Sequence, residues 1–185
     1  MQGGKGKLKR ARSGVEAEMI SPSPSPSPLA LQELRLKHFA LVVGKGRSQV
    51  SLLNAFDAAL LDAGIAHYNL VRVSSVLPPG ATERAAVELP PGALLPIAYG
   101  SISSAEKGHL LTAAVAAALP QHRGDHGVIM EYSGHLDPTE AKELVEAMAQ
   151  EAMELRALSV KEIKTAVISS EVELPTCVLA GVALF

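Results

Sequence analysis

Two adjacent serines, Ser74 and Ser75, draw attention first in this 185-residue sequence because a serine hydroxyl can act as a nucleophile. They end a strand-like run that begins at His67, and Pro78-Pro79 follows shortly after them. By composition alone, however, the ordinary interpretation holds, and the serines are turn formers ahead of a proline turn.

Two carboxylates, Glu131 and Asp57, have neighbours in the sequence that are compatible with a functional role. Glu131 stands in the apolar run 128–132, where a carboxyl group is suited to act as a proton donor, although strand alternation could equally turn it to solvent. Asp57 follows Leu53 by four residues on an expected helix, so the two side chains project from the same side. An aspartate on a helix surface is most often simply exposed.

Two other patterns are weaker. The segment 44–48, GKGRS, is expected to form a glycine loop between a strand and a helix, and such loops can cradle a phosphate. It lacks the Walker spacing, so a tight turn is favoured over a phosphate site. His122 and His126 flank Asp125, but Gly124 indicates a surface loop without enough ligands, and we expect no metal site.

The elements that must position these residues follow from hydrophobic periodicity. Asp137-Pro138-Thr139-Glu140 is a strong helix start, with an N-cap, a proline at the first position and a glutamate at the third. The segment 110–119 is ambiguous, because its alanines favour a helix while its position between strand-like runs favours a strand. Many strands and two confident helices predict an α+β layered sandwich. The expected helices are 51–63 and 137–158, and the expected strands are 38–43, 67–75, 94–103, 128–132, 163–169 and 177–184.

Composition excludes several classes of protein. Apolar residues make up 48% of the chain and the net charge is −2, which indicates a soluble globular protein without the basic excess of a nucleic-acid binder. The longest apolar runs are about half the ~20 residues that a membrane span needs. No apolar segment follows the basic N-terminus, and Cys177 is the only cysteine, so we expect a cytoplasmic protein. Residues 1–28 read as a disordered basic, Ser-Pro tail, and residues 29–185 as one domain.

From about Phe39 to the C-terminus the sequence resembles the pyruvoyl-dependent arginine decarboxylases. Several separate blocks carry the resemblance in the same order, which is more specific than one short motif. These blocks are Leu53-Asn54-Ala55-Phe56-Asp57, Ala63-Gly64-Ile65, Asn69–Pro79, Gly92-Ala93-Leu94, Ala98-Tyr99-Gly100 and Ile129-Met130-Glu131-Tyr132.

The resemblance implies that the chain cuts itself between Ser74 and Ser75. The Ser75 hydroxyl would attack the preceding carbonyl and convert the amide to an ester, and β-elimination would then release Ser74 as a new C-terminus. Hydrolysis of the resulting dehydroalanine leaves a covalent pyruvoyl group on the former Ser75. That group would form a Schiff base with the substrate amine and act as an electron sink, without metal or pyridoxal phosphate.

The resemblance also assigns roles to individual residues. Glu131 matches the proton donor, and Asn69 matches an asparagine whose amide could polarise the carbonyl under attack. Asp57 matches the substrate-binding aspartate, whose carboxylate pairs with a planar guanidinium. The remaining substrate contacts would come from Leu53, Ala66, Tyr68 and Ser74. At the position of Tyr68 the family has a small or aliphatic residue, so the arginine pocket of this chain would differ in shape there.

The family resemblance implies a four-layer αββα sandwich, self-cleaved into a β and an α chain within one domain. It further implies a homotrimer or hexamer with sites at subunit interfaces, decarboxylation of L-arginine to agmatine and CO2, and service in polyamine synthesis or acid resistance. We expect no nucleic-acid or membrane partner. Two alternatives stay open: the same chemistry on a different amino acid, and an unprocessed structural or regulatory paralogue. A simple phosphate binder is the alternative that the glycine loop suggests.

Overall fold

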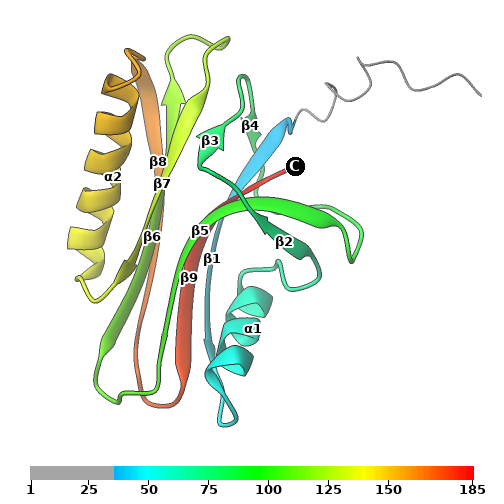
Figure 1. Cartoon of the computed structure of the whole chain (residues 1–185), viewed down its shortest axis with the longest axis vertical. Coiled ribbons are helices and arrows are strands. Elements are labelled where there is room, and N and C mark those ends of the chain that lie inside the picture. The colour runs from blue at the N-terminus through cyan, green and yellow to red at the C-terminus, as the bar shows by residue number, and fades with distance from the viewer. Residues whose placement is uncertain (1–35) are drawn as a thin grey trace, which may run out of the picture. The chain divides into compact units, whose positions relative to one another are not determined.

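The protein, described here by a computed structural model for residues 36–185, consists of two β-sheets packed face to face with one helix on the outside of each (Figure 1). The predicted tail at residues 1–28 lies outside the described residues. The predicted α+β class and αββα sandwich are confirmed. In chain order the elements are β1 (His38–Arg47), α1 (Leu52–Asp62), β2 (Asn69–Arg72), β3 (Val76–Leu77), β4 (Thr82–Glu83), β5 (Leu94–Ser104), β6 (Leu110–Pro120), β7 (Gly127–Gly134), α2 (Pro138–Glu154), β8 (Val160–Glu171) and β9 (Thr176–Leu184).

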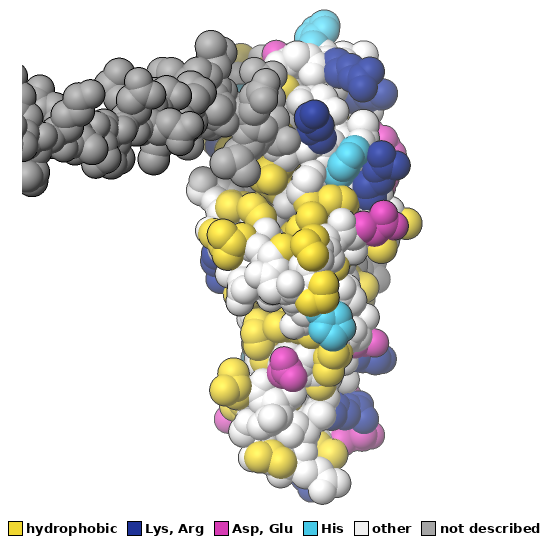
Figure 2. All heavy atoms as spheres, turned by 90° about the vertical axis from the view of Figure 1, so that its right-hand side faces the viewer, with side chains coloured by type: hydrophobic (Ala, Val, Ile, Leu, Met, Phe, Trp, Pro, Cys, Tyr) yellow, Lys and Arg dark blue, Asp and Glu magenta, His cyan; other side chains and the backbone are white. Residues whose placement is uncertain are grey.

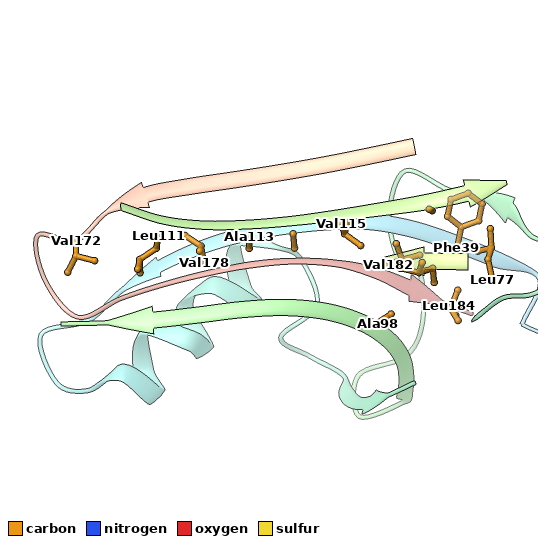
Figure 3. Close-up of a cluster of buried hydrophobic side chains, with 13 residues drawn as sticks. Phe39, Leu77, Ala98, Leu111, Ala113, Val115, Val172, Val178, Val182 and Leu184 are labelled. Carbon is orange, nitrogen blue, oxygen red and sulfur yellow. The ribbon is translucent and has the colours of Figure 1, made fainter. Parts of the chain in front are cut away.

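One sheet has the strand order β2-β5-β9-β1-β4 and packs against α1, and the other has the order β3-β7-β6-β8 and packs against α2. The main core lies between the sheets (Figure 3), where Leu111, Ala113 and Val115 of β6 meet Val178 and Val182 of β9. Small and branched side chains therefore fill the interior, as the shortage of aromatic residues requires.

The alanine-rich segment 110–119 is a strand, which resolves the ambiguity of the sequence. Its odd-numbered residues face the core between the sheets, whereas Ala114, Ala116 and Ala118 face α2. The sequence of a strand that is covered on both faces is a continuous apolar run, without the alternation of apolar and polar residues that a half-exposed strand shows. Burial by two neighbouring layers thus overrides the helix propensity of alanine.

The start of the second helix is as predicted. The Asp137 side chain accepts a hydrogen bond from the Thr139 backbone N–H at 2.8 Å, and the Glu140 side chain accepts one from the Asp137 N–H at 3.2 Å. The helix ends at Glu154, a turn earlier than the predicted Leu158. Ser51 caps α1 by accepting a hydrogen bond from the Asn54 N–H.

The predicted glycine loop at 44–48 is wrong. Strand β1 continues to Arg47, so both glycines lie within a paired strand, opposite β9. A Cβ on Gly44 would lie 2.0 Å from the carbonyl oxygen of Ala59, and one on Gly46 would lie 2.2 Å from that of Ala55. The glycines are therefore needed because α1 lies directly against the strand, and no phosphate-binding turn exists there.

The predicted strand 67–75 is also much shorter in the structure. Strand β2 spans only Asn69–Arg72 and pairs in parallel with β5 at the edge of one sheet. The chain then crosses to the other sheet, where Val76 pairs with Val128 of β7. The three residues between the two strands, 73–75, form the link between the sheets, and this link contains the serine pair.

Candidate active site

Ser75 has the backbone conformation of a strained residue. Its φ is +65°, in the left-handed region that side chains other than glycine rarely adopt. The Ser75 carbonyl accepts a hydrogen bond from the Ile129 N–H at 2.8 Å, and the next residue, Val76, is already paired with β7. Neighbouring pairing therefore holds the serine in a conformation that costs about 1–2 kcal/mol.

The Ser75 hydroxyl faces a carboxylate from a distant part of the sequence. It lies 3.2 Å from Glu131 Oε2 and 3.4 Å from Glu131 Oε1, at hydrogen-bonding distance. On β7, Met130 and Tyr132 pack towards α2 while Ile129 faces the core between the sheets, so alternation turns Glu131 towards the other sheet. Its side chain is only 22% exposed. A nucleophile and a proton acceptor thus meet at the crossing link.

A third residue, Arg72, completes this cluster. Its Nη2 lies 4.0 Å from Glu131 Oε1 and donates a hydrogen bond to the Tyr99 carbonyl at 2.7 Å. The central carbon of its guanidinium lies 4.8 Å from the centre of the Tyr99 ring. The sequence prediction missed both Arg72 and Tyr99. Both lie in blocks that carry the family resemblance, but their separation of 27 residues gives no indication that they touch.

A glycine allows the two sheets to approach next to this cluster. A Cβ on Gly100 of β5 would lie 2.7 Å from the Tyr132 carbonyl oxygen and 3.0 Å from its carbon. Tyr132 follows Glu131 on β7, while Gly100 follows Tyr99 on β5. The close contact of these backbones therefore brings Glu131 within reach of the groups at the edge of the other sheet.

The remaining predicted residues form a second, separate group on and after α1. Leu53 and Asp57 lie on α1 and are both exposed, with Leu53 exposed by 77%. The Tyr68 hydroxyl donates to the Val87 carbonyl at 3.2 Å, and the Asn69 amide donates to the Gly92 carbonyl at 2.8 Å. Ala66 is half-buried in the same segment.

Within one chain these two groups do not meet. Among residues 36–185, no hydrogen bond or ion pair joins Asp57 or Asn69 to Ser74, Ser75 or Glu131. Asn69 stands at the far end of β2 from the serine pair, and the strand alone separates it from Arg72 by about 10 Å. The structure therefore assembles the serine and carboxylate, but not the expected polarisation of the Ser74 carbonyl by Asn69.

The geometry fits a pyruvoyl group derived from the chain itself. Such a group needs a serine whose hydroxyl can attack its own preceding carbonyl, and Ser75 combines a strained backbone with a neighbouring carboxylate. In the described part of the chain no cluster of three or more histidine, cysteine, aspartate or glutamate side chains could hold a metal ion, and no helix is long and apolar enough to cross a membrane.

The one cysteine is not part of this chemistry. Cys177 is fully buried in β9, and its thiol packs against α1. Burial raises the pKa of the Cys177 thiol, and a hydrogen bond with Ser103 offsets this only in part. A neutral, buried thiol is a poor nucleophile.

Comparison with known proteins gives a consistent picture. The family model described as pyruvoyl-dependent arginine decarboxylase matches residues 38–185. Proteins named pyruvoyl-dependent arginine decarboxylase from Methanocaldococcus jannaschii and Methanococcus aeolicus are each 40% identical over 146 residues, covering 79% of this chain and 88% of theirs. The protein of that name from Pyrococcus abyssi is 39% identical over 138 residues, covering 72% of this chain and 85% of its own.

Proposed function

The chain belongs to the pyruvoyl-dependent arginine decarboxylase family, and from this membership and the geometry around Ser75 we propose that it cuts itself and then converts L-arginine to agmatine and CO2. The observation that carries the proposal is the contact of the Ser75 hydroxyl with the Glu131 carboxylate at 3.2 Å, in a link with a strained backbone. A serine that served only as a turn former would need neither feature.

Self-cleavage begins with proton transfer from the Ser75 hydroxyl to Glu131 as Oγ bonds to the Ser74 carbonyl carbon. The C–N bond then breaks, and the amide nitrogen takes the proton, so that the peptide becomes an ester. The restored Glu131 carboxylate then takes the Ser75 Cα proton, so that the Cβ–O bond breaks and Ser74 leaves as a carboxylate. Water hydrolyses the remaining enamine, ammonia leaves, and a keto group is left at position 75.

Once formed, the pyruvoyl group would hold the substrate amine covalently and accept the electron pair that carbon dioxide leaves behind. Glu131, which faces position 75, is then the group best placed to carry a proton to the substrate carbon. Its side chain is mostly shielded from water, which favours transfer to that carbon over exchange with solvent. The same carboxylate therefore serves both reactions in this proposal.

Recognition of arginine would come from the second group of residues. Asp57 offers a carboxylate to the guanidinium, and Leu53, one turn earlier on α1, offers apolar surface to the methylene chain. Tyr68 keeps its hydroxyl on the Val87 carbonyl, which leaves its ring to line the adjacent surface.

Because the two groups do not meet within one chain, we propose that a second copy completes the site, in a trimer or hexamer. The face that carries α1 and β2 supports this proposal, since apolar side chains gather across its middle (Figure 2). Leu53, Val71 and Leu94 are exposed by 77%, 41% and 69%. Exposed apolar side chains of this size are typical of a surface that another subunit covers.

The first experiment is an intact-mass measurement of the purified protein combined with an agmatine assay. Cleavage should give fragments 1–74 and 75–185, the second blocked to Edman degradation, and the cleaved protein should form agmatine from arginine. The Ser75→Ala chain has neither the nucleophile nor the leaving group and should stay whole. A wild-type chain that remains uncut after long incubation would instead support an unprocessed paralogue, and activity on another amino acid alone would reassign the substrate.

A mixing experiment tests the shared site. Asp57→Asn removes the substrate carboxylate from one group, and Glu131→Gln removes the proton carrier from the other. Each variant alone should be nearly inactive, whereas co-expression should restore activity, because mixed oligomers contain interfaces with both wild-type residues. The absence of any restoration in oligomers shown to be mixed would mean that each site is built from a single chain.

A further inference from the structure

Arg72, Glu131 and Ser75 form one cluster, here called the cleavage cluster, yet the reactions described above give Arg72 no role. We propose that Arg72 is a positioning residue, which holds the Glu131 carboxylate against the Ser75 hydroxyl and so promotes self-cleavage. This inference rests on the proposed function, because it assigns a role within the cleavage step.

Two contacts with Tyr99 hold the Arg72 guanidinium next to Glu131. Its Nη2 donates to the Tyr99 carbonyl at 2.7 Å, and the Tyr99 ring lies 4.8 Å from its central carbon. Arg72 pairs with Ile97 in the register of β2 and β5, so Tyr99 is the next residue along β5 on the same face. An arginine side chain that is 60% exposed would otherwise sample many conformations.

The positions of the two carboxylate oxygens indicate what this fixed cation does. Arg72 Nη2 lies 4.0 Å from Glu131 Oε1, while the Ser75 hydroxyl is closer to Oε2, at 3.2 Å, than to Oε1, at 3.4 Å. Attraction of Oε1 towards the guanidinium turns Oε2 towards the hydroxyl.

The charge balance of cleavage fits this arrangement. Glu131 takes the proton from Ser75 Oγ as the new C–O bond forms, and it returns that proton to the amide nitrogen as the C–N bond breaks, so the carboxylate is restored. Elimination then leaves a second carboxylate on Ser74, two residues after Arg72 in the chain. The carboxylate that Arg72 contacts is therefore the same at the start and the end of the ester-forming step.

The test is the rate of self-cleavage of freshly purified or freshly translated chain, followed by intact mass, in three variants. Arg72→Met keeps much of the side-chain length but removes the charge, and should slow cleavage by roughly threefold to tenfold, as loss of a half-exposed ion pair would. Arg72→Lys retains the charge and should recover most of the wild-type rate. Arg47→Met is the matched control, because Arg47 is a half-exposed arginine ion-paired with Glu173, remote in the fold from the cut, and it should cleave like wild type.

Three results would overturn the proposal: wild-type cleavage rate in Arg72→Met, no recovery in Arg72→Lys, or equal slowing in Arg47→Met. Each of these leaves the proposed function standing, whereas an uncut wild-type chain removes both proposals. If Arg72→Met does not fold, as judged by thermal unfolding, Tyr99→Leu decides the matter. It removes the ring beneath the guanidinium and should slow cleavage about twofold to fivefold, and an unchanged rate would overturn the role of Arg72.

Discussion

Replacement of Gly100 by alanine probes how closely the two sheets must approach for the cleavage cluster to form. The added Cβ would lie 2.7 Å from the Tyr132 carbonyl oxygen, where ordinary contact begins near 3.4 Å. The obstacle is backbone and not the end of a flexible side chain, so β5 and β7 must separate by about 0.7 Å. Overpacking of this kind costs about 1–3 kcal/mol of unfolding free energy.

The same displacement acts on the chemistry. Glu131 is the residue before Tyr132 on β7, and its Oε1 lies 4.0 Å from Nη2 of Arg72, which belongs to the sheet of β5. A separation of about 0.7 Å would lengthen this ion pair, whereas Ser75 moves with Glu131 because its carbonyl accepts a hydrogen bond from the Ile129 N–H of β7. We therefore expect Gly100→Ala to slow self-cleavage by roughly threefold to tenfold, the same loss as removal of the Arg72 charge.

The assay is intact mass against time after purification, with thermal unfolding measured on the same samples. The unfolding midpoint should fall by about 2–12 °C for a chain of this size. Gly46→Ala is the matched control, because its Cβ would meet the Ala55 carbonyl oxygen at 2.2 Å, against α1 and away from the cut. It should lower stability at least as much and leave cleavage of the folded chain unchanged. Wild-type cleavage in Gly100→Ala, or equal slowing in Gly46→Ala, would refute the reasoning.

Three further predictions concern the framework. Gly44→Val should lower the unfolding free energy by more than about 3 kcal/mol, because α1 lies directly against that strand. Phosphate should not raise the unfolding temperature of the wild-type protein. An increase with phosphate would instead indicate an anion-binding site at residues 44–48. Burial raises the pKa of Cys177, so the contribution of the buried thiol to the unfolding free energy should be complete below the ordinary thiol pKa of 9.0 and fall at higher pH. The buried thiol of the native protein should also react slowly with thiol reagents. The fall in unfolding temperature between pH 8 and pH 10 should be smaller in Cys177→Ala, and equal slopes would contradict this. Asp137→Ala removes the α2 cap and should cost about 1 kcal/mol without changing the cleavage rate, measured by the same two assays.

The local signals of the sequence predicted the framework well. The N-cap, proline and glutamate at Asp137–Glu140 predicted the start of α2 because capping acts between residues three apart in the chain. The long strands at 94–104 and 160–171 were also predicted, with ends that differ by a few residues. Where a strand is covered on both faces, as at 110–120, periodicity disappears, and local sequence could not choose between helix and strand.

Errors arose where distant segments meet. Nothing near Gly44 and Gly46 in the sequence indicates that a helix packs directly against them, so close packing was mistaken for a turn. The end of β2 depends on the chain leaving one sheet to pair with β7 in the other, which is a property of the whole fold. Local preference along 67–75 remains strand-like throughout, and it therefore predicted a strand that was too long.

By itself, the sequence determined the chemical groups available and the segments that carry them: the serine pair, the carboxylates of Glu131 and Asp57, and an α+β order of strands and helices. Only the tertiary structure decided which of these groups meet. It brought Glu131 to Ser75 across 56 residues, added Arg72 and Tyr99, and left Asp57 in a separate group. The reason is physical, because side-chain types and local periods are encoded along the chain, whereas contacts between sheets depend on pairing, register and the close approach that Gly100 allows.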